Sequence, residues 1–286
     1  MTVAFWQIGV GLALAALAAA VVLLFRRGLG RKLSRRLRRA KKLRYPVVLA
    51  HGMLGFDELR FRGVRHEYFR GVSGRLRGLG AEVYTFGVSP TGSVALRARQ
   101  LADAIAGLDA RRVNIIAHSM GGLDARLAVA RLGLATRVAS LTTIGTPHRG
   151  TPLADIGTDL LEGKLGLLGL LDRLGLPTEA LWDLTTGRME RFNQSVPDAR
   201  NVCYASVVAR HRGSVRELSA PLVPAYLFLV ERAGENDGVV PTSSQVWGEV
   251  LRTIEADHWA QVGWGKRFDA PGFYAELVRA LMQRGF

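Results

Sequence analysis

The stretch VNIIAHSMGG, residues 113–122, joins an apolar run to a serine and leaves that serine through two glycines. Such an apolar run is typical of a buried strand, and the residues after the glycines favour a helix. A serine hydroxyl becomes an effective nucleophile at a tight strand-to-helix turn, where a histidine can take its proton. Serine followed by glycine also marks ordinary turns, but its position after a buried-type strand predicts Ser119 as a nucleophile.

The base that would activate this serine must be one of the three histidines that follow it, His148, His211 and His258. His148 lies in the loop after the next expected strand, too early in the sheet to be the base. His211 is flanked by two arginines and is typical of a solvated loop residue. His258 comes late in the chain, after a last expected strand, and we therefore predict it as the base.

The orienting acid is predicted from the run GENDGVVP, residues 234–241. The apolar run 226–230 precedes it and is expected to be a strand. Asp237 would then lie at a strand's C-terminal end, where open α/β sheets hold their sites. Asn-Asp-Gly is also a common turn sequence. The order serine, acid, histidine matches the triad order on sheets of this kind and favours Asp237.

The oxyanion hole needs one main-chain N–H from the residue after the nucleophile and a second from the loop after an early strand. Residues 45–50 are expected to form that early strand, and HGMLG follows it at 51–55. We assign the two donors to the main chain of Met53 and Met120. His51 is expected to form hydrogen bonds within its loop and not to act in catalysis.

Several segments share their sequence and order with one known family. They are YPVVLAHGMLGF (45–56), GAEVYTFGVSP (80–90), RARQL (97–101), VNIIAHSMGGLDAR (113–126), LTTIGTPHRG (141–150) and NDGVVP (236–241). Residues 45 to about 265 thereby resemble the bacterial triacylglycerol lipases of the true-lipase group, the Pseudomonas and Burkholderia type. The resemblance implies an α/β-hydrolase, a triad on Ser119, Asp237 and His258, and hydrolysis of carboxylic esters of lipids.

Two departures limit what the resemblance implies. Those lipases usually bind a structural calcium through an aspartate two residues past the catalytic histidine, and Ala260 stands at that position here. A hard divalent cation needs several oxygen ligands, so we expect this calcium site to be absent or much weakened, with no other cofactor. Cys203 is the only cysteine, so no intrachain disulfide can form, which favours a reducing compartment.

The chain before residue 45 has a different composition. Residues 4–25 carry no charged side chain and would span roughly 33 Å as a helix, enough for a bilayer core. A cleaved export signal is the alternative, but a basic start and a convincing cleavage site are missing. Residues 26–44 hold 11 Lys or Arg and no acid, out of a net charge of +15. A basic run beside a membrane span indicates anionic-lipid contact rather than nucleic-acid binding, and predicts an inner-membrane protein whose enzyme domain faces the cytoplasm.

Strands and helices alternate after residue 45, which predicts a mostly parallel sheet with helices on both faces in one domain, 45–286. The segment 151–197 is long for a connection and rich in leucine and glycine, so we interpret it as a helical cap or lid, with a core helix as the alternative. Strands are expected at 45–50, 81–87, 112–117, 138–144, 202–208, 225–230 and 251–255, and helices at 64–79, 93–108, 120–132 and 273–283.

These features together predict a membrane-anchored serine lipase or esterase with a lipid ester as substrate. A phospholipase, a polyester depolymerase or an acyltransferase would share the same triad and differ in the shape of the pocket. A catalytically silent membrane scaffold would keep the fold, but the complete order of the triad argues against it.

Overall fold

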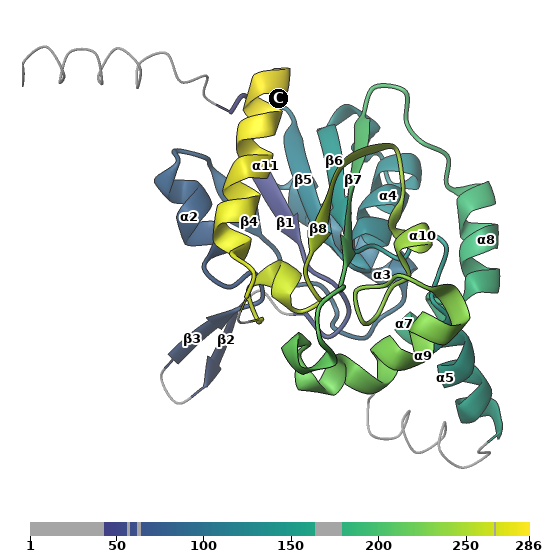
Figure 1. The fold of residues 1–286 in the computed structure, drawn as a ribbon. Helices are drawn as coiled ribbons and strands as arrows, with labels where there is room; N and C mark the ends of the chain where they lie inside the picture. Colours follow the sequence, from purple (N-terminus) through teal and green to yellow (C-terminus); the bar gives the residue numbers. More distant parts are fainter. Residues whose placement is uncertain (1–42, 56–57, 62–63, 164–178, 266) are drawn as a thin grey trace, which may run out of the picture. The chain divides into compact units, whose positions relative to one another are not determined.

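The computed structural model describes residues 43–286 except 56–57, 62–63, 164–178 and 266 (Figure 1). Residues 43–286 form one compact unit built around a parallel sheet of six strands in the order β4-β1-β5-β6-β7-β8. The strands are β1 Val47–Ala50, β4 Val83–Thr85, β5 Val113–His118, β6 Val138–Ile144, β7 Cys203–Arg210 and β8 Glu249–Glu255. The sheet confirms the predicted α/β class, and six of the seven expected strands belong to it.

Helices cover both faces of this sheet (Figure 1). Successive side chains of a strand point to opposite faces, so Val47 and Leu49 pack toward α2 and α11, whereas Val48 and Ala50 pack toward α3 and α4. The helices are α2 Val72–Gly78, α3 Val94–Ala106, α4 Gly121–Arg131, α5 Pro152–Gly163, α7 Glu179–Asp183, α8 Thr186–Ser195, α9 Val223–Ala233, α10 Thr242–Gln245 and α11 Ala270–Arg284. Short 3-10 turns are η1 Leu134–Thr136, η2 Val215–Glu217, η3 Ala220–Leu222 and η4 Ala260–Val262.

The central strands β5 and β6 are buried along their whole length. A parallel strand that is covered on both faces has no polar side, which explains the continuous apolar run before Ser119. Because all six strands run in one direction, their C-terminal ends meet at one edge of the sheet. The loops that leave this edge carry the predicted site residues.

Two expected elements differ from the structure. The run 225–230, expected as a strand, lies in helix α9, which has Pro224 in its first turn and Gly234 as its C-terminal cap, positions that favour a helix. A short apolar run is ambiguous between strand and helix, and these two boundary residues were the better signal. The helix expected at 64–79 is in fact strand β3, Val64–Glu67, followed by α2, and β3 pairs antiparallel with β2, Glu58–Phe61.

The expected placement in the inner membrane is corrected by the helices that the structure describes. Within residues 43–286, with the gaps given above, no helix is long and apolar enough to cross a bilayer. The longest of them, α11, has 15 residues, or about 22 Å at 1.5 Å per residue, short of a core about 30 Å thick. The run 4–25, on which the expectation rested, and residues 26–42 lie outside the described part of the chain.

Candidate active site

Ser119 occupies the turn between β5 and α4, at the C-terminal edge of the sheet. Its φ of 56° lies in the left-handed region, which costs a non-glycine residue about 1 to 3 kcal/mol and persists only when neighbours fix it. Here the main-chain N–H of Ser119 donates to Ile144 (2.9 Å), and the Thr146 hydroxyl donates to the Ser119 carbonyl (2.8 Å). The turn is therefore held from the neighbouring strand, β6, and its loop.

The helix after Ser119 passes very close to strand β1. A Cβ atom on Gly121 would lie 2.6 Å from the Ala50 carbonyl oxygen and 2.7 Å from that of His51. A backbone carbonyl cannot move aside cheaply, so only glycine fits at this position. Gly121 thus lets the start of α4 lie against β1 and the loop that follows it, whereas Gly122 faces Thr143 and Thr146 on the other side.

The structure brings the three predicted side chains of the triad together. The His258 Nε2 atom lies 3.0 Å from the Ser119 Oγ atom, and the His258 Nδ1 atom lies 2.8 Å from the Asp237 Oδ2 atom. All three residues are buried, with Ser119 8 % and His258 6 % exposed. These distances fit a base that takes the serine proton while a carboxylate holds the other ring nitrogen.

Asp237 is held by a dense set of donors and is completely buried. Its Oδ1 atom accepts hydrogen bonds from the main-chain N–H groups of Val239 (3.0 Å) and Val240 (2.8 Å). The expectation that a strand directly precedes Asp237 is wrong, because residues 225–230 belong to helix α9. The loop nevertheless returns to the sheet edge, since His211, directly after β7, donates its N–H to the Asn236 carbonyl.

The loop after β1 lies against the nucleophile. A Cβ atom on Gly52 would be 2.7 Å from the Ser119 Cβ atom, so the main chain of this loop reaches the serine itself. Met53 follows Gly52, and Met120 follows Ser119. Among the described residues, neither methionine's main-chain N–H donates to another protein atom, which leaves both available for an oxyanion.

His51 and Arg97 stabilise this loop. The His51 ring accepts from the Val88 N–H at Nε2 (3.2 Å), and its Nδ1 atom lies 2.9 Å from the Gly52 carbonyl. The Arg97 guanidinium is fully buried and donates to the carbonyls of His51 (2.7 Å) and Ser89 (2.6 Å). It also pairs with Asp124 on α4, and although burial raises the pKa of Asp124 to about 6, Arg97 opposes that shift. Sequence reasoning assigned no role to Arg97, because only the fold brings it under the loop.

The other two downstream histidines lie apart from the triad. His148 is buried, and its Nε2 and Nδ1 atoms lie 3.0 Å from the Thr143 hydroxyl and 3.3 Å from the Arg126 guanidinium. Burial, with nearby Arg126, lowers the pKa of His148 and keeps its ring neutral. His211 Nε2 lies 3.0 Å from the Ser214 carbonyl in a loop. Neither ring contacts the serine.

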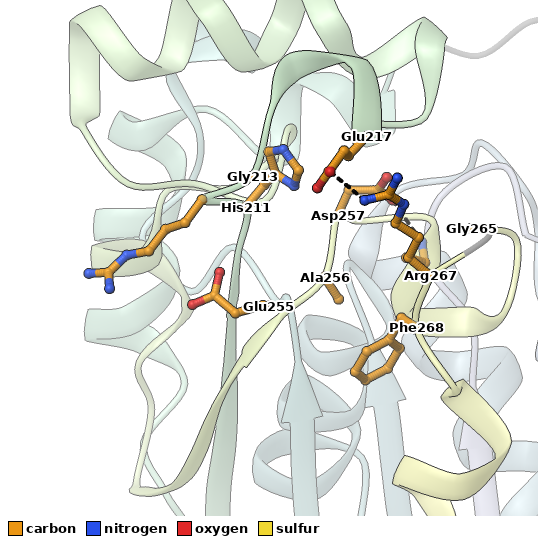
Figure 2. Close-up of a pocket in the computed structure, with 11 residues that line it drawn as sticks. His211, Gly213, Glu217, Glu255, Ala256, Asp257, Gly265, Arg267 and Phe268 are labelled. Atoms are coloured by element: carbon orange, nitrogen blue, oxygen red, sulfur yellow. Dashed lines mark hydrogen bonds and ion pairs between the residues drawn. The ribbon is translucent and has the colours of Figure 1, made fainter.

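The surroundings of Ala260, where the resembling lipases have a calcium ligand, bear on the expectation that this calcium site is absent or much weakened. This residue lines a cavity of about 370 Å³ that contains the side chains of Glu217, Glu255 and Asp257 (Figure 2). Every one of these carboxylates is already bound: Glu217 to Arg267, Glu255 to Arg210, and Asp257 to the N–H and hydroxyl of Ser219. The Arg267 guanidinium also carries positive charge into the cavity, so these residues do not fit a hard divalent cation.

Ser119 lies at a strand-to-helix turn and within hydrogen-bond distance of His258, which in turn lies within hydrogen-bond distance of Asp237. This arrangement on a parallel sheet of this strand order is typical of an α/β-hydrolase. The family model described as "Alpha/beta hydrolase family" matches residues 47–281. The chain belongs to this family and is a hydrolase.

Curated relatives agree with this assignment. The chain is 32% identical over 307 residues to "Triacylglycerol lipase 2" of Saccharomyces cerevisiae, which covers 84% of this chain and 92% of that protein. It is 30% identical over 292 residues to a triacylglycerol lipase of Pseudomonas fragi, which covers 85% and 97%. Among solved structures, a Staphylococcus hyicus lipase has a TM-score of 0.67 at 18% identity, covers 86% of this chain and 97% of its own, and supports the fold alone.

Proposed function

We propose that this protein hydrolyses carboxylic esters of lipids with Ser119 as nucleophile, His258 as base and Asp237 as orienting acid. The observation that carries the proposal is the pair of distances at His258, 3.0 Å to Ser119 Oγ and 2.8 Å to Asp237 Oδ2. The names of the curated relatives, triacylglycerol lipases from a yeast and from several bacteria, support the class of substrate.

The reaction follows from the roles of these groups. His258 Nε2 takes the proton of Ser119 Oγ as the oxygen attacks the ester carbonyl, and the carbonyl oxygen becomes an oxyanion bound by the Met53 and Met120 N–H groups. Collapse breaks the bond to the alcohol, which leaves with the proton from His258. Water, deprotonated by His258, then attacks the acyl-enzyme carbonyl, the bond to Ser119 Oγ breaks, and His258 returns its proton to that oxygen as the acid leaves. Asp237 holds the His258 Nδ1–H throughout.

Exposed apolar side chains beside the site support a lipid substrate. Leu54, next to the proposed donor Met53, is 67% exposed, and Trp259, next to His258, is 41% exposed. Helix α9 adds Leu227 at 50% and Val230 at 45%. Apolar side chains in water are costly, and they gain most from contact with acyl chains.

We also infer a catalytic domain over residues 45–286 with a cap at 151–197. The described part of that cap is helical, and α5 packs on α7, α8 and α9 (Figure 1). This arrangement supports a cap next to the loop that bears Asp237, which directly follows α9. Residues 164–178 of the cap lie outside the described residues.

A substrate panel tests the proposal. Purified full-length protein should hydrolyse p-nitrophenyl butyrate and tributyrin, with a Ser119→Ala protein as the blank. Release of fatty acid from phosphatidylcholine in preference to tributyrin would indicate a phospholipase and not a triacylglycerol lipase. Acyl transfer to an added alcohol in preference to water would indicate an acyltransferase, and no turnover of any ester would contradict the proposal.

The protein is expected to keep its activity and melting temperature after treatment with EDTA. The reason is that the carboxylates around Ala260 are satisfied by arginines and by Ser219, so no bound cation is needed to neutralise them. Thermal melts and p-nitrophenyl butyrate assays before and after dialysis check this. A fall in melting temperature that added Ca²⁺ reverses would show a cation site elsewhere in the chain.

A further inference from the structure

Three side chains that take no part in the proposed reaction form a row of hydrogen bonds beside the triad: Tyr68, which is half-buried, and His118 and Gln261, which are buried. The Tyr68 hydroxyl lies 2.7 Å from the His118 Nδ1 atom, and the His118 Nε2 atom lies 3.2 Å from the Gln261 Oε1 atom. At one end Tyr68 accepts the Gly52 N–H of the oxyanion loop (3.2 Å), and at the other Gln261 Nε2 donates to Asp237 Oδ2 (2.7 Å). The chain thus joins the oxyanion loop to the catalytic acid.

The direction of every hydrogen bond in this chain is fixed by the chemistry of its members. An ionised Asp237 can only accept, so Gln261 must present its NH₂ to it and its carbonyl oxygen to His118. That oxygen also only accepts, so His118 carries its proton on Nε2. Its Nδ1 atom is then an acceptor and takes the Tyr68 hydroxyl proton, while the Tyr68 oxygen accepts from Gly52.

Burial keeps both titratable members of the chain in the required form. His118 is 1% exposed, and burial together with the nearby His258 ring, 4.6 Å away between centroids, lowers the pKa of His118 well below its usual value. Burial also raises the pKa of Tyr68, which therefore keeps its proton. A neutral histidine and a protonated tyrosine are the two states that the hydrogen-bond directions demand.

The backbone leaves little room for the chain to rearrange. Gln261 is completely buried, and Gly145 has a positive φ of 56° beside it. A Cβ atom on Gly145 would lie 2.3 Å from the Gln261 Oε1 atom and 3.1 Å from the Asp237 Oδ2 atom. A glycine at this point lets the amide and the carboxylate share the space between β6 and the His258 loop.

We propose that Tyr68, His118 and Gln261 are positioning residues that act as one unit, fixing Asp237 and the Gly52 segment of the oxyanion loop relative to each other. This inference rests on the proposed function, since it gives these three residues a part in the reaction of the proposed triad. Loss of the Tyr68 hydroxyl frees His118 to move its proton to Nδ1. The lone pair on His118 Nε2 would then face the lone pairs of the Gln261 oxygen. Alternatively, the Gln261 amide would turn, and its oxygen would face the Asp237 carboxylate.

A double-mutant cycle on the full-length protein tests whether the chain acts as a unit. Tyr68→Phe and Gln261→Met each remove hydrogen bonds at a similar side-chain volume. Each is expected to lower kcat on p-nitrophenyl butyrate about three- to tenfold, the scale of one net hydrogen bond, with KM changed less than twofold. The double variant should lose no more kcat than the more impaired of the two single variants, because the first substitution already interrupts the row of hydrogen bonds. Tyr84→Phe is the matched control, since it removes a hydroxyl bonded to exposed Glu82 and should leave kcat unchanged.

Active sites are counted by fluorophosphonate titration, so that kcat refers to folded enzyme. Losses that multiply in the double variant, or single variants with wild-type kcat, would overturn the coupling. If a variant fails to fold, ¹⁵N spectra of the wild-type histidines decide: His118, assigned by its absence in His118→Asn, must appear neutral with the proton on Nε2. A proton on Nδ1 or a cationic ring contradicts the inference. An inactive wild type would instead refute the proposed function.

Discussion

Ser119→Ala is expected to lower kcat for p-nitrophenyl butyrate by about a million-fold, to the rate that the oxyanion hole and binding alone can give. The loss is this large because the three side chains act together, and His258 has no proton to take once the hydroxyl is gone. Ester assays at high enzyme concentration measure the residual rate. The melting temperature should hardly change, since alanine and serine bear the same backbone cost at a φ of 56°.

The matched control is Ser195→Ala, at the exposed end of α8, where the hydroxyl donates only to the Phe192 carbonyl. That variant should keep wild-type kcat. Ester hydrolysis by Ser119→Ala within tenfold of wild type would mean that another nucleophile carries the reaction, and the assignment would fail.

Asp237→Asn is expected to lower kcat by about ten-thousandfold through the wrong tautomer of His258. The Val239 and Val240 N–H groups require an acceptor, so the amide oxygen of the new side chain must take the place of Oδ1. Its NH₂ group then faces His258 Nδ1, which must present a lone pair. The ring proton moves to Nε2, and His258 points a donor at Ser119 where a base is needed.

Asp257→Asn provides a close comparison, because Asp257 is also buried and directly precedes His258. Its carboxylate accepts from Ser219, Trp259 and Ala260 and does not contact the His258 ring, so kcat should fall less than tenfold. The comparison uses kcat for p-nitrophenyl butyrate, measured as a function of pH for Asp237→Asn, Asp257→Asn and the wild type. Equal losses in the two variants would show that any carboxylate of this loop has the same structural effect, against the role given to Asp237.

The sequence predicts this fold well where local chemistry alone determines the structure. The strand before Ser119 is buried on both faces, so its apolar run is continuous, and Gly121 fits the close passage of α4 against β1. The run 225–230 shows the limit, since its apolar residues suit a strand or a helix equally. Only Pro224 in the first turn of α9 and Gly234 at its C-terminal cap favour the helix.

Contacts between distant segments could not be predicted from the sequence. Gln261 and His118 are 143 residues apart, and neither lies in a motif that links it to the other. The same holds for Arg97, which reaches the His51 carbonyl and Asp124 only after α3 and α4 pack on the sheet. Asp237 was identified by the order of the triad, although the strand expected before it is a helix.

Mass spectrometry of the protein after reaction with a fluorophosphonate tests the central claim most directly. The reagent phosphonylates a serine whose proton a neighbouring base removes, and the adduct stays on the protein with loss of fluoride. The account predicts one adduct per chain, on the peptide that contains Ser119, formed much more slowly in Asp237→Asn and absent from Ser119→Ala. No adduct in the wild-type protein, or an adduct on a different residue, would contradict it.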